Sequence, residues 1–341
     1  MILGIDVASM ILGGLAAGMV LFVVSVGLSV TMGLMGFVNL AHGAFAMLGG
    51  YVTVALLKTW QWSLAFPGAP AWLPFGRNPI IIDKSFEMPL WLALPLAALI
   101  VGAFSILLER TLYRRLYKAT ELDQVLFTIG LVLAATATVT LVVGPENQTI
   151  PLPPDLQGQL DLGIVQYRTY SLLLIGLGVI IMLALRFGFE RTRMGARIRA
   201  AVDNARMAES LGINIGRLFT LTFAFGSAMA ALGGGLGAEF LGLDPQYPLK
   251  YLVLFLIVVA VGGVGRITGV FYAALIIGVL DFALKSNVLN LLLERLGGES
   301  VLVRVLSGTM TYLQRGSMLF IYLLTILLLL WRPRGLFGKA A

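Results

Sequence analysis

Few polar residues in this chain could do chemistry inside an apolar stretch, and His42 with Asn39 stands out among them. His42 is the single histidine, and Asn39 lies one helical turn earlier, on the same face of a predicted apolar helix. Polar groups at membrane depth are costly and normally face a bundle interior, so both residues and the adjacent Gly43 are candidates to line a path for a polar solute. Hydrogen bonding between helices explains the pair equally well.

Glycines surround this pair and indicate a tightly packed or broken helix. They are Gly33, Gly36, Gly43, Gly49 and Gly50. Backbone groups that are freed at a helix break could meet both charges of a zwitterionic ligand.

Other reactive groups are scarce in the sequence. No cysteine occurs, which excludes disulfides, thiol catalysis and cysteine-ligated metals. Glu109, Glu239 and Asp281 fall near the ends of apolar runs, whereas a proton-coupled carrier normally needs a titratable group in its core. Asp281 precedes Lys285 by four residues, which favours a surface ion pair. Because zinc-ligand clusters, nucleophile–base pairs and a phosphate-binding P-loop are also missing, we expect no enzyme, no metal site and no cofactor bound by this chain.

The longest basic connection, residues 186–217, is the second candidate site. Its apolar residues recur with helical spacing and predict a short amphipathic helix parallel to the membrane: Ile198, Ala201, Ala205, Ala208 and Leu211. Gly212 is a plausible helix stop, and Asn214 opens a turn before the next apolar run. Such a segment is either a surface loop whose arginines touch lipid head groups or a docking element for a soluble partner.

The elements that must position these residues are membrane helices. Hydrophobic residues make up 59% of the 341 residues and charged residues only 12%, which is too few to cover a water-facing surface. The sequence therefore predicts an all-α, polytopic transmembrane helix bundle in one domain, with about nine spans (eight to ten). The apolar spans are 10–32, 37–57, 90–108, 124–143, 170–187, 217–238, 250–264, 267–284 and 318–331.

The distribution of cations orients this bundle. Short cytoplasmic loops carry the excess of Lys and Arg. An N-terminus outside and a C-terminus in the cytoplasm put 15 of the 24 cations inside. The Pro-rich connections 58–89 and 144–169 and the segment 285–317 are then extracytoplasmic. The span 250–264 is short enough to be a re-entrant half-helix, but the closing cations favour a true crossing.

Small residues recur every four positions at Gly226, Ala230, Gly234 and Ala238, and Gly14 and Gly18 form another such pair. This spacing is typical of membrane helices that approach one another closely. We interpret it as helix packing.

Four segments in the same order resemble the branched-chain amino-acid permease family of ABC importers, in its LivH-type branch. They read GLMGFVNLAHG from Gly33, AVDNARMAESLGIN from Ala201, VGGVGRITG from Val261 and RPRGLFG from Arg332. The resemblance covers nearly the whole chain. The long connection 58–89, with Trp60, Trp62 and Trp72, departs from the commonest family pattern and weakens any inference about the substrate.

The resemblance implies a permease subunit in the bacterial cytoplasmic (inner) membrane that imports branched-chain or other hydrophobic amino acids by alternating access. It implies a second homologous permease subunit, two cytoplasmic ATPase subunits that bind ATP-Mg and an extracytoplasmic substrate-binding protein, with no nucleic acid. The residues that would couple to the ATPase are Ala201, Asn204, Ala205, Met207, Ala208, Gly212 and Ile213. The alternatives are a permease for urea, an amide or an aromatic acid, and an ion-coupled secondary transporter.

Overall fold

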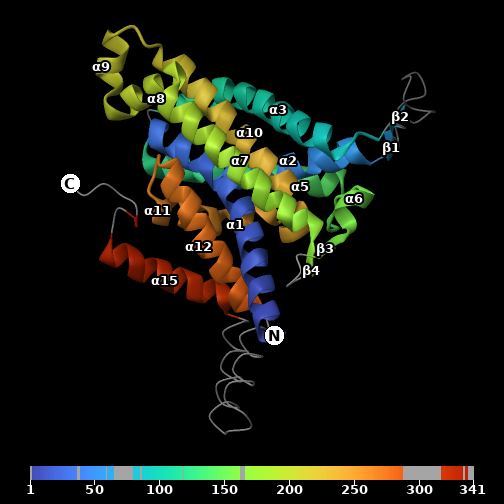
Figure 1. Cartoon of the computed structure of the whole chain (residues 1–341). Coiled ribbons are helices and arrows are strands. Elements are labelled where there is room, and N and C mark those ends of the chain that lie inside the picture. The colour runs from blue at the N-terminus through green and yellow to red at the C-terminus, as the bar shows by residue number, and fades with distance from the viewer. Residues whose placement is uncertain are drawn as a thin grey trace.

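The structure is a computed structural model and is almost wholly helical (Figure 1). It describes residues 2–36, 39–58, 60–64, 80–84, 87–117, 119–161, 166–286, 316–332 and 335–336.

Six described helices are long and apolar enough to cross a membrane. They are α1 (Ile2–Met35), the continuous run of α3 (Leu90–Leu108), η1 (Glu109–Tyr113) and α4 (Arg114–Leu116), then α5 (Glu121–Val142), α7 (Thr169–Arg191), α10 (Ile215–Leu241) and α12 (Ile267–Lys285). Shorter apolar helices are α2 (His42–Leu57), α11 (Tyr247–Gly262) and α15 (Ser317–Trp331). Each of the nine predicted spans overlaps one of these helices. How many of them cross a bilayer stays a prediction.

Helices α1 and α10 form the centre of the bundle. Helix α1 packs against α12, α10, α7 and α11, while α10 also packs against α2 and α3. Aromatic rings join these contacts edge to face: Phe22 of α1 lies 5.2 Å from Phe271 of α12, and Phe45 of α2 lies 5.7 Å from Phe223 of α10, measured between ring centroids. The two central helices therefore contact most of the other spans, whereas α5 packs on α2 and α11, and α15 packs on α12 and α11.

Glycine makes the closest of these contacts possible. A Cβ atom built on Gly27 of α1 would lie 2.4 Å from the carbonyl oxygen of Gly226, and one built on Gly18 would lie 2.9 Å from that of Ala274. Gly234 meets the backbone of Ala46 in the same way. The interpretation of the small-residue pattern as helix packing is confirmed.

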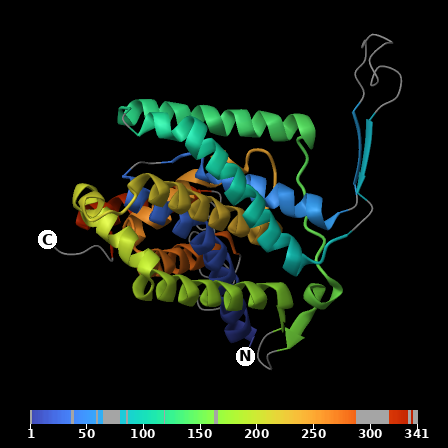
Figure 2. The same ribbon diagram turned by 90° about the horizontal axis from the view of Figure 1, so that it is seen from above.

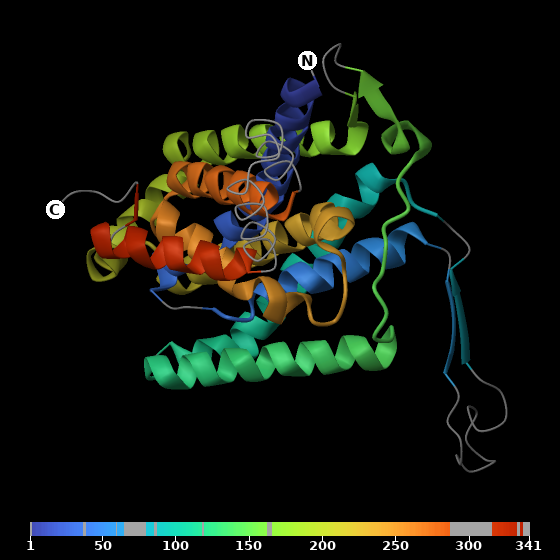
Figure 3. The same ribbon diagram turned by 90° about the horizontal axis from the view of Figure 1, so that it is seen from below.

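The bundle has two distinct ends. One, here called the hairpin end, carries the antiparallel strands β1 (Trp60–Leu64) and β2 (Ile80–Lys84), the strands β3 (Gln159–Asp161) and β4 (Gln166–Arg168), and the short helix α6 (Pro154–Gln157). The opposite end, here called the basic end, carries α8 (Arg193–Asp203) and α9 (Ala205–Ser210). The three views agree that these sets lie far apart (Figures 1, 2 and 3).

The predicted inside cations that the structure describes gather at the basic end. Glu109, beside Arg110 and Arg114, bonds to Thr220 near the start of α10, and the backbone N–H of Leu336, after Arg332, donates to Val261 at the end of α11 over 2.8 Å. At the hairpin end, Gln148 of the connection 144–169 bridges to Leu243 before α11. The end of α11 thus lies beside the closing segment of the chain, while its start packs on Gly43 of α2, so a full crossing by the span 250–264 stays a prediction.

One detail of the predicted fold is wrong, and one region lies outside the described residues. The helical bundle itself agrees with the prediction, and the connections 58–89 and 144–169 each add a short antiparallel strand pair outside it. The second apolar helix begins at His42 and not at residue 37, because Gly36 has a positive φ of 67° and ends α1. Most of the predicted segment 285–317 and the aromatic residues between 65 and 79 lie outside the described residues.

Candidate functional site

The connection 186–217 folds as a compact helical unit on the basic end. Thr192 caps α8, and its Oγ1 accepts from the backbone N–H of Gly195 at 3.1 Å. Gly195 lies so close to the end of α7 that a Cβ there would meet the carbonyl oxygen of Phe189 at 2.1 Å. Arg199 donates to the same carbonyl oxygen. Helix α8 is thus folded tightly back against α7.

Asn204 divides the predicted single helix over residues 201–211 into α8 and α9, so that prediction is wrong. Its backbone is extended, and its Oδ1 accepts from the N–H of Met207 at 3.0 Å as the N-cap of α9. The break resets the helical phase, so Leu211, predicted on the same face as Ala201, is instead 75% exposed. Gly212, with φ of 81°, ends the unit as predicted, and Asn214 caps α10.

The predicted coupling residues divide into an inward and an outward set. Ala201 and Ala208 are buried and, with Ile198, pack on Leu34 of α1 and Leu218 of α10, where Ile213 also contacts them. Asn204, Met207 and Gly212 are exposed. Of Ala205 the structure describes the backbone, at the start of α9. The buried residues Ala201 and Ala208 attach the unit to α1 and α10. The exposed residues Asn204, Met207 and Gly212, together with Leu211, form a surface with polar and apolar parts that faces away from the bundle.

Near the start of α10 lies a buried carboxyl group whose partners come from two helices. The Glu109 side chain has no exposed surface and accepts from Thr220 Oγ1 at 2.7 Å and from Tyr117 Oη at 2.8 Å, with Arg114 Nε 3.9 Å away. Glu109 begins the π-helical turn η1, which turns this side chain toward α10. Desolvation raises the pKa of Tyr117 and keeps its phenol protonated. Sequence reasoning missed this network; the only local signal was a Glu within an Arg-rich helix end.

The predicted path residues lie at the break between α1 and α2. Asn39 precedes α2, so the prediction that it sits one helical turn before His42 is wrong; its Oδ1 accepts from the N–H of Ala41 and from Tyr113 Oη, each at 3.0 Å. His42 Nε2 donates to the carbonyl oxygen of Val24 at 2.9 Å. A Cβ on Gly43 would lie 3.1 Å from the Cα of Pro248 in α11.

The break therefore brings α1, α2, η1 and α11 together around buried polar groups. All of Asn39, His42 and Gly43 are buried. Because α2 begins at the depth of Val24, midway along α1, residues 39–41 lie inside the bundle as non-helical backbone. Irregular backbone at this depth is tolerated only where protein or a water-filled cavity surrounds it.

The other two carboxylates that the sequence analysis singled out, Glu239 and Asp281, make simple ion pairs. Lys285 Nζ lies 2.7 Å from Asp281 Oδ2, which confirms the predicted pair, and Arg168 Nη1 lies 4.0 Å from Glu239 Oε1. Among the described residues no group of three or more His, Asp or Glu side chains could hold a metal ion.

Comparison with known proteins agrees with this architecture. Residues 10–329 match the family described as "Branched-chain amino acid transport system / permease component". The high-affinity branched-chain amino acid transport system permease protein LivH of Salmonella typhimurium is 28% identical over 81% of this chain and 85% of its own length, and LivH of Escherichia coli is 27% identical over the same shares. BraD of Pseudomonas aeruginosa, with a corresponding name, is 25% identical over 80% of this chain and 84% of its own.

A shorter match is to a permease that is named for a different substrate. The tyrosine transport system permease protein of Clostridioides difficile is 36% identical over 75 residues, 22% of this chain and 25% of its own. No solved structure matches. With its family match spanning nearly the whole sequence and its apolar helices forming a multi-pass membrane bundle, this chain belongs to the permease family of branched-chain amino acid transport systems.

Proposed function

We propose that this chain is the permease subunit of an ATP-binding cassette importer that moves branched-chain or other hydrophobic amino acids inward across the cytoplasmic membrane. The observation that carries the proposal is the α8–α9 unit: it is anchored by buried residues to both central helices and leaves Met207 and Leu211 exposed, at 60% and 75%. Exposed large apolar side chains beside charged ones are typical of a protein interface.

The energy for transport must come from a partner protein. Its sequence has no P-loop, so ATP and Mg²⁺ would be bound by two cytoplasmic ATPase subunits. Closure of those subunits would push on α9. Because Ala201 and Ala208 pack on Leu34 and Leu218, that displacement would reach α1 and α10 directly. Both helices would then move relative to the helices around them, which is the rigid-body motion that alternating access needs.

The path for the solute would run beside the break between α1 and α2. Asn39, His42 and Gly43 meet there with Tyr113, and their present partners are groups of the chain itself. A change in the relative position of α1, α3 and α11 would release these groups for a polar ligand. A second homologous permease subunit would supply the other wall, and an extracytoplasmic binding protein would deliver the solute to the hairpin end.

Aromatic amino acids are the second candidate substrate class. The short match to a tyrosine transport permease favours them, although the longer matches are to proteins named for branched-chain amino acids. Binding assays with the cognate binding protein, comparing leucine with tyrosine, would distinguish the two classes.

The docking role is tested by co-purification of the ATPase subunits. We expect Met207→Glu with Leu211→Glu to abolish most association, because two charges replace the apolar part of the exposed surface. Leu160→Glu is the matched control, since Leu160 is 49% exposed in β3 at the hairpin end. Unchanged association in the double variant would overturn the docking role.

A further inference from the structure

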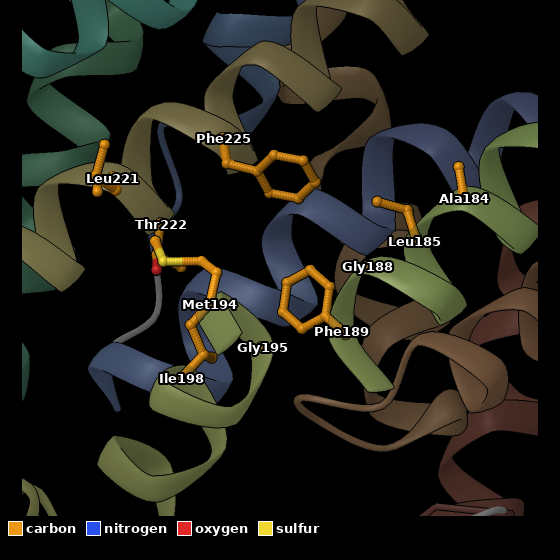
Figure 4. A pocket seen from close by; sticks show the side chains of 10 residues that line it. All are labelled: Ala184, Leu185, Gly188, Phe189, Met194, Gly195, Ile198, Leu221, Thr222 and Phe225. Carbon is orange, nitrogen blue, oxygen red and sulfur yellow. The ribbon is translucent and has the colours of Figure 1, made fainter. Parts of the chain in front are cut away.

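A cavity of about 400 Å³ opens between α7, α8 and α10 at the basic end (Figure 4). Its volume falls in the range of small-molecule pockets, roughly 300–1,000 Å³. Its walls are apolar except for one hydroxyl group. The lining residues include Leu185, Phe189, Met194, Ile198 and Phe225.

The mouth of this cavity faces outward from the bundle. Ala184 of α7 and Leu221 of α10 line it and are exposed on the outer surface of their helices. Both belong to segments long and apolar enough to cross a membrane, close to the ends of those segments at the basic end. A hydrocarbon chain of the surrounding bilayer could therefore enter from the side without passing through water.

Thr222 is the exception in the wall. Its side chain is 2% exposed, and its Oγ1 has no hydrogen-bond partner among the described residues. A buried hydroxyl group without a partner costs free energy, so a ligand oxygen that accepted from Thr222 would recover that cost.

The positive charge around the cavity favours a lipid with an anionic head group. Residues 186–199 contain five arginines and one glutamate. Arg193 and Arg197 directly precede the lining residues Met194 and Ile198 on α8, are four residues apart and are exposed. Each guanidinium group can donate two parallel hydrogen bonds to a phosphate, and residues four apart lie on the same face of a helix.

We propose that this cavity binds one acyl chain of an anionic phospholipid, with the phosphate on Arg193 and Arg197 and an ester carbonyl accepting from Thr222. Because Met194, Gly195 and Ile198 belong to α8, the bound lipid would brace the coupling unit against α7 and α10. The site is distinct from the exposed surface of α9 and from the break at Asn39.

The test measures lipid retained by the purified full chain after reconstitution in vesicles of phosphatidylcholine and phosphatidylglycerol at a ratio of about three to one, followed by extraction and native mass spectrometry. We expect tight retention of phosphatidylglycerol alone. Ala184→Trp should block the mouth and reduce retention at least about tenfold, since excluding two or three methylenes from the cavity suffices for that loss. Ile180→Trp, one turn away, 62% exposed and outside the lining, is the control.

Arg193→Gln with Arg197→Gln should likewise abolish the preference, whereas Arg110→Gln with Arg115→Gln, two exposed arginines elsewhere on the basic end, should preserve it. Thr222→Val, equal in shape, should weaken retention severalfold. Equal retention of both lipids, or wild-type retention in Ala184→Trp, would overturn the proposal. Since the readout needs neither ATPase nor solute, its failure would leave the transport function untouched.

Discussion

Glu109 is a buried residue on which two helices depend. Its carboxyl oxygens accept from Thr220 of α10 and from Tyr117 at the end of its own helix, and its side chain has no exposed surface. Glu109→Ala would remove both hydrogen bonds, and a hydrogen bond to a charged group is worth about 1.5–3 kcal/mol. We expect a loss of about 2–4 kcal/mol in the free energy of unfolding, measured by denaturation in detergent.

Glu109→Gln keeps an acceptor oxygen and should lose less than half as much. Glu121→Ala is the control, because Glu121 is exposed in the first turn of α5; it should stay within about 0.5 kcal/mol of the wild type. If Glu109→Ala were as stable as Glu121→Ala, the network would not hold α3 to α10.

The partners of individual side chains were the hardest feature to predict from the sequence. The pair Asp281–Lys285 could be predicted because four residues on one helix fix its geometry. Glu109 and Thr220 lie 111 residues apart, and the π-helical turn that directs Glu109 inward leaves no pattern in the sequence. Asn39 is similar, because its partner Tyr113 lies 74 residues away. Partners that only the tertiary fold brings together cannot be read from local spacing.

At the scale of elements, the crossing of α2 and α10 depends on a glycine. A Cβ on Gly234 would lie 1.9 Å from the carbonyl oxygen of Ala46, a backbone atom that cannot rotate away. Gly234→Ala should therefore separate the two helices and cost about 1–3 kcal/mol or more. Gly176→Ala in α7, where nothing lies within 4 Å, should be neutral or stabilising. Equal thermal stability of the two variants would contradict this contact.

The α8–α9 boundary makes a separate prediction about capping. Asn204→Ala removes the side chain that caps α9 and should cost about 1 kcal/mol locally, whereas Asn204→Asp keeps the acceptor. Hydrogen exchange of α9 should quicken about fivefold in the first variant only. Gly212→Ala should have a similar cost because of the positive φ, and Gly212→Asn less. Unaltered exchange in Asn204→Ala would show that tertiary packing alone holds α9.

Element types could be predicted better than their boundaries. Apolar length marked every described membrane helix, because hydrocarbon thickness fixes the length of a span. The start of α2 and the division at Asn204 could not be placed, since Gly36 and Asn204 act through backbone conformation and apolar periodicity continues past both. The β-hairpins were missed because their strands are short: β1 reads WQWSL and does alternate apolar and polar residues, but only over five residues, and β3 and β4 have three residues each.

At the scale of the whole molecule, the two ends differ as the cation distribution predicts. Arginines gather with α8 and α9, while both β-hairpins lie opposite (Figure 1). Under the positive-inside rule this arrangement predicts that the basic end faces the cytoplasm. This orientation is what gives the coupling surface access to a cytoplasmic partner, so the proposed function depends on it.

The chain offers a direct test of that orientation, since it contains no cysteine and a single introduced thiol reports on one position. Gln159→Cys in β3 and Gln246→Cys before α11 should react with a membrane-impermeant maleimide in intact cells. Ser210→Cys in α9 and Val264→Cys after α11 should react only once the membrane is permeabilised. All four residues are exposed, so access and not burial decides the result. Labelling of positions 246 and 264 from the same side would make α11 a re-entrant helix and move the end of α15 outside, against the cation distribution.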